Sequence, residues 1–423
     1  MLKKLTITDF KSIAKAEMTF GKVNLFIGAN GSGKSNTLEA IGVLSAALSR
    51  DITDMELQRK GVRLSVPTLF KSAFKNRKLP AQFSLQAELD SSVNYHVRIT
   101  AGEQFQTLRF FTEDLTYNDE RYFGRSNRGI TLRGFQETRP DIAPERGLWD
   151  RFRELIDTPT ELSDSLNQLA KFCIYAPQTS FLRGIDIESS PVKPIGLMGG
   201  GLPQAAFATT FYYHYKTKDV DNLFLDIFEL TFMPDWADEI SIKESMPDMV
   251  SSQVRTGEKT LYFRDRFMTL KRNILSAYDS SEGSLYLLFL ATLIFHPEAP
   301  KIFALDNVDN SLNPAATRSF LEQLISVVNE EKYQQLGIGP EQVFLTSHNP
   351  TSLDAFDLFN DDQRIFVVSR APKSGFTTIE RLQPPPGMTR AEWIQVQAGR
   401  NLSELWIEGL IPNALGMSTK GGL

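Results

Sequence analysis

The chain has 423 residues, more than one average domain, which predicts either a core domain with a large insertion or two domains. Its formal net charge of −5 argues against a generally basic nucleic-acid-binding protein, but it allows a local basic patch. The single cysteine, Cys173, excludes an internal disulfide framework and a cysteine-rich metal site, and its apolar neighbours Phe172 and Ile174 indicate a buried thiol.

Neither a secretory leader nor a membrane-spanning helix is expected. The N-terminal residues contain no long apolar run, and the most apolar segment, residues 285–295, is too short to cross a bilayer. We therefore expect a cytoplasmic protein in a reducing compartment, with no membrane partner.

The first elements in chain order are two strands. Residues 2–8 alternate apolar and polar side chains, and a second strand is expected near residues 16–20. Lys11, between them, is placed to reach a nucleotide phosphate or ribose. An exposed lysine on a hairpin is more often only a solvated charge, and we favour that interpretation.

A phosphate-binding loop follows the next strand, residues 23–27. The segment Gly28-Ala29-Asn30-Gly31-Ser32-Gly33-Lys34-Ser35 fits G-x-x-x-x-G-K-[ST], and Asn36 begins an apolar-periodic helix that reaches residue 44. Glycines let successive backbone N–H groups turn toward phosphate oxygens. Lys34 supplies charge for the β- and γ-phosphates, and Ser35 supplies a hydroxyl for Mg²⁺. These nine residues, Gly28 to Asn36, are the candidate nucleotide-binding loop.

The middle of the chain, residues 50–260, gives weaker signals. Residues 82–89, 95–100 and 107–112 each resemble a strand, and residues 147–172 resemble a helical stretch with Trp149, Phe152, Leu155 and Ile156 on one face. Lys71, Lys75, Arg77 and Lys78 form a basic run that is able to meet nucleic-acid phosphates. Such a run is more often a solvated loop, which is the interpretation we favour.

The pattern becomes informative again after residue 260. Residues 261–275 read as a strand and then a helix, and Ser280 or Ser281 is a natural N-cap for the apolar helix that follows. Residues 302–305 form a short apolar strand that ends at Asp306, which is where an open α/β sheet binds ligands. Asp306 is therefore the natural partner of the Mg²⁺ held by Ser35.

Further elements complete the chain. Residues 319–333 predict an amphipathic helix, and the strand 343–347 ends at His348, which becomes a candidate γ-phosphate contact beside Asp306. Strands at 365–368 and 377–382 precede the break at Pro384-Pro385-Pro386-Gly387. A last helix at 401–408 carries Leu402, Leu405 and Trp406, which we expect to pack on the core.

Taken together, these segments resemble the heads of ABC-type ATPases, in the soluble RecF, SMC and OLD group. The resemblance rests on Asp9-Phe10-Lys11-Ser12, the loop 28–36, Ser281-Glu282-Gly283-Ser284, Leu305-Asp306 through Asn313-Pro314, and Thr346-Ser347-His348, in that order. It implies an α/β fold with a mixed sheet flanked by helices, an antiparallel N-terminal β region and a large α+β insertion. The expected parts are residues 1–49 and 261–385 as the two halves of the head, 50–260 as the insertion and 386–423 as a helical tail.

The resemblance also implies a mechanism that needs two copies. ATP and Mg²⁺ on one protomer would be capped by Ser281 and Gly283 of the other, because a helix N-terminus is a good anion partner. Residues 310–313 would cross the dimer seam. Gln178 is a candidate for completing the Mg²⁺ and water shell, and a polar loop residue of no consequence is an equally open interpretation.

One departure from the family pattern concerns catalysis. The family usually has glutamate after the strand-end aspartate as the general base, and this chain has Asn307, followed by Val308 where proline is common. An amide accepts no proton, and loss of a general base costs on the order of 10²- to 10⁴-fold in rate. We expect slow hydrolysis unless Asp309 or His348 substitutes.

Three function classes follow from the resemblance. The first is a soluble ATPase that dimerises, or assembles further, around ATP-Mg and regulates a separately encoded effector such as a nuclease, as in bacterial defence against phage. The alternative is a RecF-like protein that binds DNA in repair or recombination. A transporter head is disfavoured by the large middle insertion. The tail is expected to be too short for the nuclease domain of OLD-like proteins.

Overall fold

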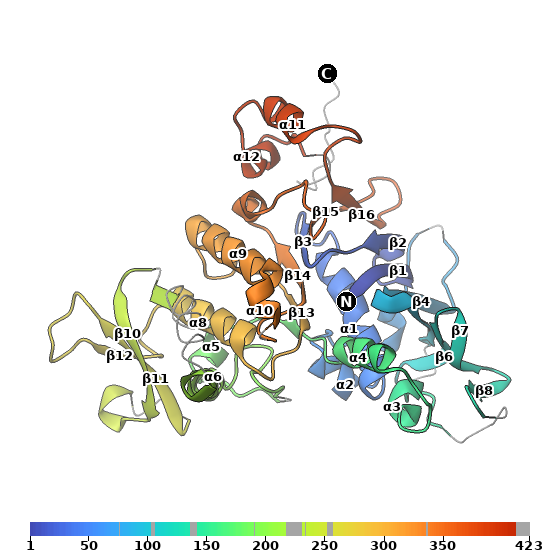
Figure 1. Cartoon of the computed structure of the whole chain (residues 1–423), viewed down its shortest axis with the longest axis horizontal. Coiled ribbons are helices and arrows are strands. Elements are labelled where there is room, and N and C mark those ends of the chain that lie inside the picture. The colour runs from blue at the N-terminus through green and yellow to red at the C-terminus, as the bar shows by residue number, and fades with distance from the viewer. Residues whose placement is uncertain are drawn as a thin grey trace. The chain divides into compact units, whose positions relative to one another are not determined.

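The computed structural model describes the chain except residues 76, 103–105, 136–141, 190, 217–230, 233, 252–256, 336 and 412–423. Most of its helices and strands are labelled in Figure 1. The chain divides into two compact units. The first comprises Met1–Ile174, Pro300–Val308 and Glu341–Leu423, and the second comprises Tyr175–Ala299 and Asp309–Pro340.

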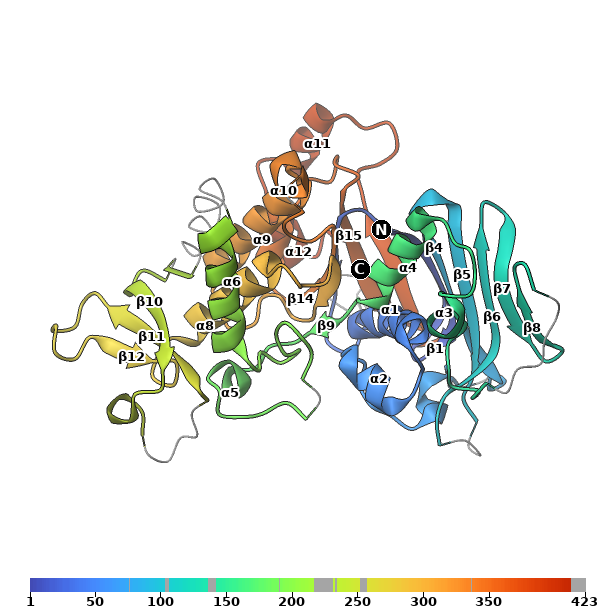
Figure 2. The same cartoon turned by 60° about the horizontal axis from the view of Figure 1, so that its bottom comes forward.

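A seven-stranded antiparallel sheet forms one half of the first unit, in the order β2-β1-β4-β5-β6-β7-β8. Its strands are β1 (Leu2–Phe10), β2 (Ile13–Thr19), β4 (Gln82–Leu89), β5 (Val93–Thr100), β6 (Arg109–Tyr117), β7 (Glu120–Ser126) and β8 (Gly129–Leu132). Buried and half-buried residues alternate along β4, as expected for a sheet with one covered face. Helices α1 (Lys34–Ser49), α3 (Leu148–Phe152) and α4 (Thr160–Ala170) lie on that face (Figure 2).

A six-stranded mixed sheet forms the other half, in the order β16-β15-β3-β14-β13-β9. It contains β3 (Val23–Ile27), β9 (Ile174–Tyr175), β13 (Ile302–Leu305), β14 (Gln342–Ser347), β15 (Gln363–Arg370) and β16 (Thr377–Leu382). β3 pairs in parallel with both β14 and β15, and β13 pairs in parallel with β14. Every residue of β3, β13 and β14 is buried, because strands of a covered parallel sheet are apolar on both faces.

The predicted α/β class, with a mixed sheet and an antiparallel N-terminal β region, is confirmed. The strand predicted at 107–112 lies instead at 109–117, and β7 and β8 were not predicted. The single helical stretch predicted for 147–172 is wrong, because it is two helices, α3 and α4. Leu155 falls between them and is 57% exposed, so it does not share the buried face of Trp149.

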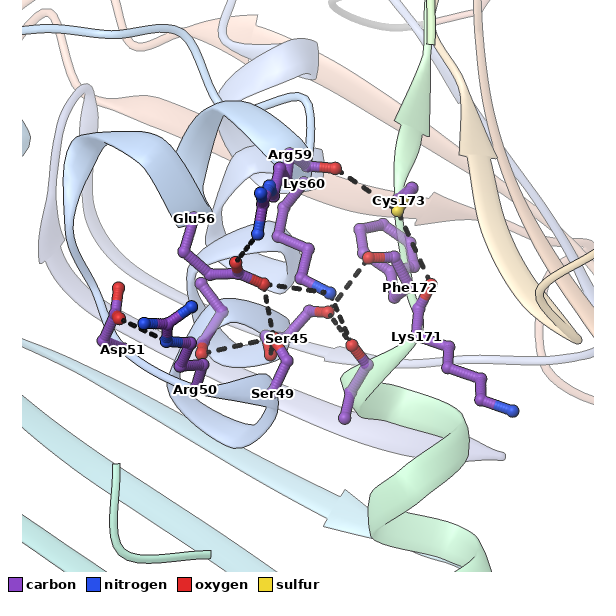
Figure 3. Close-up of polar contacts among 12 residues, drawn as sticks. Ser45, Ser49, Arg50, Asp51, Glu56, Arg59, Lys60, Lys171, Phe172 and Cys173 are labelled. Carbon is purple, nitrogen blue, oxygen red and sulfur yellow. Dashed lines mark hydrogen bonds and ion pairs between the residues drawn. The ribbon is translucent and has the colours of Figure 1, made fainter. Parts of the chain in front are cut away.

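The helix that follows the phosphate-binding loop is buried along most of its length. A polar cluster fixes it to its neighbours (Figure 3). Ser45 Oγ donates to the backbone oxygens of Ala170 and Phe172, at 3.0 and 2.9 Å. Lys60 Nζ, just after α2 (Asp54–Arg59), donates to the same Ala170 oxygen at 2.6 Å and lies 3.7 Å from Glu56. The C-terminal part of α1 is therefore held by α2 and by the end of α4.

Cys173 lies beside this cluster and is buried, as predicted. Burial raises the pKa of its thiol to about 11. A thiol with so high a pKa is a poor nucleophile, so Cys173 is a packing residue.

Short helices complete the first unit: η1 (Pro67–Phe70), η2 (Asp90–Ser92), η4 (Pro350–Ala355), α11 (Arg390–Gln397) and α12 (Leu402–Ile407). Leu402, Leu405 and Trp406 of α12 are buried, which confirms their predicted packing role. Ser403 of α12 also bonds to Asp354 of η4, with its Oγ 2.7 Å from the carboxylate.

The second unit contains a three-stranded antiparallel sheet of β10 (Ala237–Glu244), β11 (Lys259–Asp265) and β12 (Ile274–Ser276). Its helices are α5 (Thr179–Leu182), α6 (Leu202–Lys216), α8 (Glu282–Phe295), α9 (Pro314–Asn329) and α10 (Glu331–Gln335), with η3 (Pro247–Met249). The helix predicted to end at residue 275 is wrong, since residues 266–273 form a loop. The helix predicted from 319 begins at Pro314, where Asn313 caps it by accepting from Ala316 N at 2.9 Å.

The most apolar helix, α8, is buried from Ser284 to Phe295. In the part of the chain that the structure describes, none of the helices combines the length and the hydropathy that spanning a membrane requires.

Candidate nucleotide-binding site

The phosphate-binding loop joins the central strand β3 to helix α1, within the first unit. Gly28 has a φ of 147°, and a Cβ there would lie 2.0 Å from the backbone oxygen of Val368. Gly33 has a φ of 114°, and a Cβ there would lie 2.4 Å from Thr377 Oγ1. Both glycines are therefore required by backbone conformation and by close neighbours.

Lys34 is the first residue of α1, and its side chain is buried. Its Nζ donates to the backbone oxygens of Gly28, at 2.7 Å, and Ala29, at 3.1 Å. Nζ also lies 3.3 Å from Nδ1 of His348, which follows β14. Lys34 and His348, two candidates chosen from distant parts of the sequence, thus lie in contact.

The proposed metal ligands form a second contact. Ser35 Oγ donates to both carboxylate oxygens of Asp306, at 3.2 and 3.0 Å. Asp306 follows β13 at the edge of the sheet where β3 and β14 also end, because these strands are parallel. A hydroxyl and a carboxylate are hard oxygen ligands of the kind that Mg²⁺ takes beside phosphate oxygens and water. This donor pair fits that ion.

A hydroxyl of the neighbouring strand orients the aspartate. Thr346 Oγ1 of β14 donates to Asp306 Oδ1 at 2.5 Å, and it accepts a hydrogen bond from Asn307 N at 2.7 Å. Asn307 is exposed and has a φ of 59°, in the left-handed region that asparagine tolerates better than most residues.

A pocket of about 440 Å³ surrounds these groups, a volume in the range of ligand sites. Its walls are formed by Asn30, Gly31, Gly33, Lys34, Ser35, Asn36, Arg63, Asn307, His348 and Arg370. A second pocket of about 510 Å³ shares Asn36, Arg63 and Arg370 with it. Ser12, Leu64, Leu69 and Phe74 are among the residues that line the second pocket, so it offers both polar and apolar surface.

Two arginines of these pockets were missed by sequence reasoning. Arg370 ends β15, and its Nε donates to the backbone oxygen of Gly31 at 3.1 Å. The rule that ligands gather at the ends of parallel strands could have identified it. Arg63 Nη2 donates to Asn36 Oδ1 at 3.1 Å, and no sequence signal marks this arginine.

The helix that follows the loop, α1, carries a buried carboxylate. Glu39 of α1 is paired with both Lys11 and Arg63. The solvated interpretation of Lys11 is therefore wrong: the side chain is mostly buried, and burial lowers its pKa while Glu39 opposes that shift. The solvated interpretation of the basic run is also wrong at Lys71, which is buried.

The other candidate residues belong to the second unit. Ser281 occupies the N-cap position of α8, and Gly283 lies in the first turn of that helix. Gln178 precedes α5, with its backbone N–H donating to Met198 O at 2.9 Å. Asp309 begins the second segment of this unit. In the first unit, the phosphate-binding loop, Asn307 and His348 therefore line one pocket, and Asp306 contacts Ser35 of that loop. Ser281, Gly283, Gln178 and Asp309 lie in the second unit.

Two protein families match the chain. The family described as "AAA ATPase domain" matches residues 1–124, and the family described as "AAA domain, putative AbiEii toxin, Type IV TA system" matches residues 201–354.

Curated proteins named "DNA replication and repair protein RecF" match short parts of the chain. The protein from Magnetococcus marinus is 53% identical over 49 residues, which cover 11% of this chain and 13% of that protein. The protein from Clavibacter sepedonicus is 30% identical over 120 residues, which cover 27% of this chain and 29% of that protein. The chain thus matches less than a third of the length of either protein.

A solved structure of the Smc head domain of Pyrococcus furiosus, bound to the C-terminal domain of ScpA, aligns with 90% of this chain and 96% of its own. The two are 14% identical, with a TM-score of 0.46. The family and RecF matches thus show that residues 1–124 and 201–354 are similar to AAA-family ATPase domains and that short parts of the chain are similar to RecF proteins.

Proposed function

We propose that the protein binds ATP and Mg²⁺ at the phosphate-binding loop and that two copies assemble around the nucleotide to regulate a separately encoded effector, such as a nuclease, in anti-phage defence. One observation carries the nucleotide part of this proposal. The contacts of Ser35 with Asp306 and of Lys34 with His348 join the loop to the ends of β13 and β14.

Each residue of the pocket has a role in this proposal. Lys34 would exchange its backbone acceptors for the β- and γ-phosphate oxygens, and His348 would contact the γ-phosphate. Ser35 and Asp306 would hold Mg²⁺, which neutralises phosphate charge when bound. Gln178 stays a candidate for the metal and water shell. Ser281 and Gly283 would contact the nucleotide held by a second copy.

We further propose that hydrolysis is slow. Asn307 stands at the position of the expected general base, and its amide accepts no proton. Its left-handed φ of 59° suits asparagine and disfavours glutamate. Asp309 and His348 are the alternative bases. A slow ATPase keeps its nucleotide for long periods, which suits a sensor or clamp.

The regulatory role has separate support. The family matched at residues 201–354 is described as "AAA domain, putative AbiEii toxin, Type IV TA system", and this description supports a regulatory role. RecF-like DNA binding is the second candidate function, and the RecF matches over parts of the chain favour it. The net charge of −5 weighs against the second candidate.

The test measures ATP turnover and oligomer mass for the native chain, Lys34→Ala and Asn307→Glu. We expect the native chain to assemble with ATP and turn over slowly, Lys34→Ala to stay unassembled, and Asn307→Glu to hydrolyse faster. Asn118→Glu is the matched control, because Asn118 also has a left-handed φ, of 49°, in the turn after β6. Fast native turnover that Asn307→Glu leaves unchanged would contradict the assignment of the missing base.

A DNA titration separates the two candidate functions. ATP-dependent binding to duplex DNA that weakens steeply with salt would favour the RecF-like function. Two results together would favour the defence function: no such DNA binding, and a partner gene whose product is toxic in a manner that depends on this protein.

A further inference from the structure

Three segments of the second unit meet at the carboxylate of Glu282. Glu282 is the first residue of α8, and its Oε1 accepts hydrogen bonds from the hydroxyls of Thr179 and Ser311. The Ser311 bond measures 2.6 Å. Thr179 begins α5, and Ser311 lies in the loop before α9. One oxygen atom therefore bridges three separate parts of the chain.

Other contacts bring the same segments together. Arg183 Nη2 donates to Ser280 O at 3.3 Å, and Asn310 Nδ2 lies 3.5 Å from Pro177 O. A Cβ added at Gly283 would lie 3.0 Å from the backbone oxygen of Ser311. The start of α8 is thus packed closely against the loop that contains Ser311. Glu282 supplies a charged acceptor in this junction, and Arg183 supplies a charged donor.

Each of the three segments carries a candidate site residue. Gln178 directly precedes Thr179, Ser281 and Gly283 flank Glu282, and Asp309 lies two residues before Ser311. A change at any one of these segments has to be accommodated by the other two, as long as the Glu282 bonds hold.

The charge of Glu282 also matters. The bonds from Ser311 and Thr179 lower the pKa of this carboxyl, so it is ionised at neutral pH. A negative charge at a helix N-terminus is favourable for the helix, but it repels phosphate. The two hydroxyls hold the carboxylate to the side of α5 and the Ser311 loop, next to the Ser281 and Gly283 positions.

We propose that Glu282 is a positioning residue that couples the Gln178 segment and the Asp309–Ser311 loop to the face that Ser281 and Gly283 offer to a second copy. This inference rests on the proposed function. In it, Glu282 does not contact the reacting atoms. It sets how readily ATP binding leads to assembly, while leaving the affinity of the phosphate-binding loop for ATP unchanged.

The experiment compares the native chain with Glu282→Ala, Glu282→Gln, Thr179→Val and Ser311→Ala. Two quantities are measured separately: binding of a fluorescent ATP analogue at low protein concentration, and ATP-driven assembly by light scattering. Glu331→Gln is the control, because Glu331 is an exposed carboxylate at the start of α10 in the same unit.

We expect Glu282→Ala to raise the ATP concentration for half-assembly by about tenfold, a typical coupling between sites, with analogue binding unchanged. Glu282→Gln should be intermediate, because its carbonyl oxygen still accepts from both hydroxyls. Thr179→Val and Ser311→Ala should each give part of this increase in the ATP concentration for half-assembly. Combined with Glu282→Ala in a double variant, neither should increase it further.

Two results would overturn the coupling role. One is native-like assembly of Glu282→Ala. The other is a parallel loss of analogue binding and thermal stability, which would make Glu282 a purely structural residue. A third result concerns the proposed function. If the native chain binds the ATP analogue more tightly than Lys34→Ala but does not assemble with ATP, the proposed assembly is wrong. The coupling role of Glu282 is then wrong as well.

Discussion

Nζ of Lys34 and Nδ1 of His348 lie 3.3 Å apart, although 314 residues separate them in the sequence. A lysine ammonium only donates hydrogen bonds, so in this contact Nδ1 is the acceptor and the proton of a neutral imidazole is on Nε2. The same ammonium is held by the backbone oxygens of Gly28 and Ala29. Phosphate therefore competes with three acceptors for one cation.

Lys34→Ala should weaken ATP binding by about 10- to 100-fold, because a charge-assisted hydrogen bond is worth about 1.5–3 kcal/mol. Isothermal titration calorimetry measures the change. Lys15→Ala removes an exposed lysine of β2 and should leave affinity at the native value. Equal affinity of native and Lys34→Ala protein would exclude Lys34 from phosphate binding.

Thr346→Val should lower the affinity for Mg²⁺-ATP by about tenfold or more, because residues that orient metal ligands have effects of this size. The change removes the donor to Asp306 and the acceptor for Asn307 N while keeping the side-chain volume. It should also cost about 1–3 kcal/mol of stability. Thr346→Ser keeps the hydroxyl, so its Mg²⁺-ATP affinity and its stability should stay close to the native values. Titration of Mg²⁺ at fixed ATP tests this, and a Thr346→Val protein with native Mg²⁺ dependence would refute it.

Gly28→Ala and Gly31→Ala should differ, although both glycines have positive φ. A Cβ at Gly28 would lie 2.0 Å from the backbone oxygen of Val368, whereas a Cβ at Gly31 meets no atom within 4 Å. We expect Gly28→Ala to abolish nucleotide binding. Gly31→Ala should cost only about 1 kcal/mol of backbone strain and keep binding. Filter binding with labelled ATP and thermal melts separate the two, and equal behaviour would contradict the cradle geometry.

Glu113 should make stability depend on pH. Its carboxylate is fully buried on β6 and bonded to Tyr95 OH at 2.9 Å and to Leu148 N at 3.0 Å, with Arg125 at 3.2 Å. Burial raises its pKa from 4.5 to about 7, against the opposing effect of Arg125. The folded chain therefore binds more protons than the unfolded chain between these pH values. The stabilising contribution of Glu113 is complete below about pH 4.5 and is lost as pH rises to about 7.

This shift corresponds to a loss of about 3 kcal/mol at most between pH 4.5 and 8. Denaturant unfolding of native protein and Glu113→Gln across that range measures it. The native chain should lose stability relative to Glu113→Gln as pH rises. A difference that is constant with pH would show that Glu113 has an ordinary pKa.

The sequence predicted the strands of the sheet that carries the pocket except β9. Strands β3, β13, β14 and β16 are short apolar or alternating runs bounded by turn residues, and such runs are the pattern by which strands are recognised in a sequence. The positions of Asp306 and His348 followed from the rule that parallel strands end at one edge.

Other features could not be predicted, for physical reasons. Phe267, Met268 and Leu270 have helix-like apolar spacing, yet they are exposed in the loop between β11 and β12, at 72%, 44% and 91%. The ion pairs of Glu39 with Lys11 and Arg63 join residues brought together only by the fold. No local pattern of charge distinguishes such a buried pair from a solvated lysine.

The position of β3 has a consequence for biosynthesis. The ribosome makes this strand, at residues 23–27, long before its two neighbours β14 and β15, at residues 342–347 and 363–370. β3 cannot pair with β14 or β15 until more than 300 further residues have been synthesised, and pairings between such distant segments form late in folding. A nascent chain stopped before residue 342 therefore lacks both hydrogen-bonding partners of β3. ATP-agarose capture of stalled nascent chains should therefore begin only once β15 has emerged.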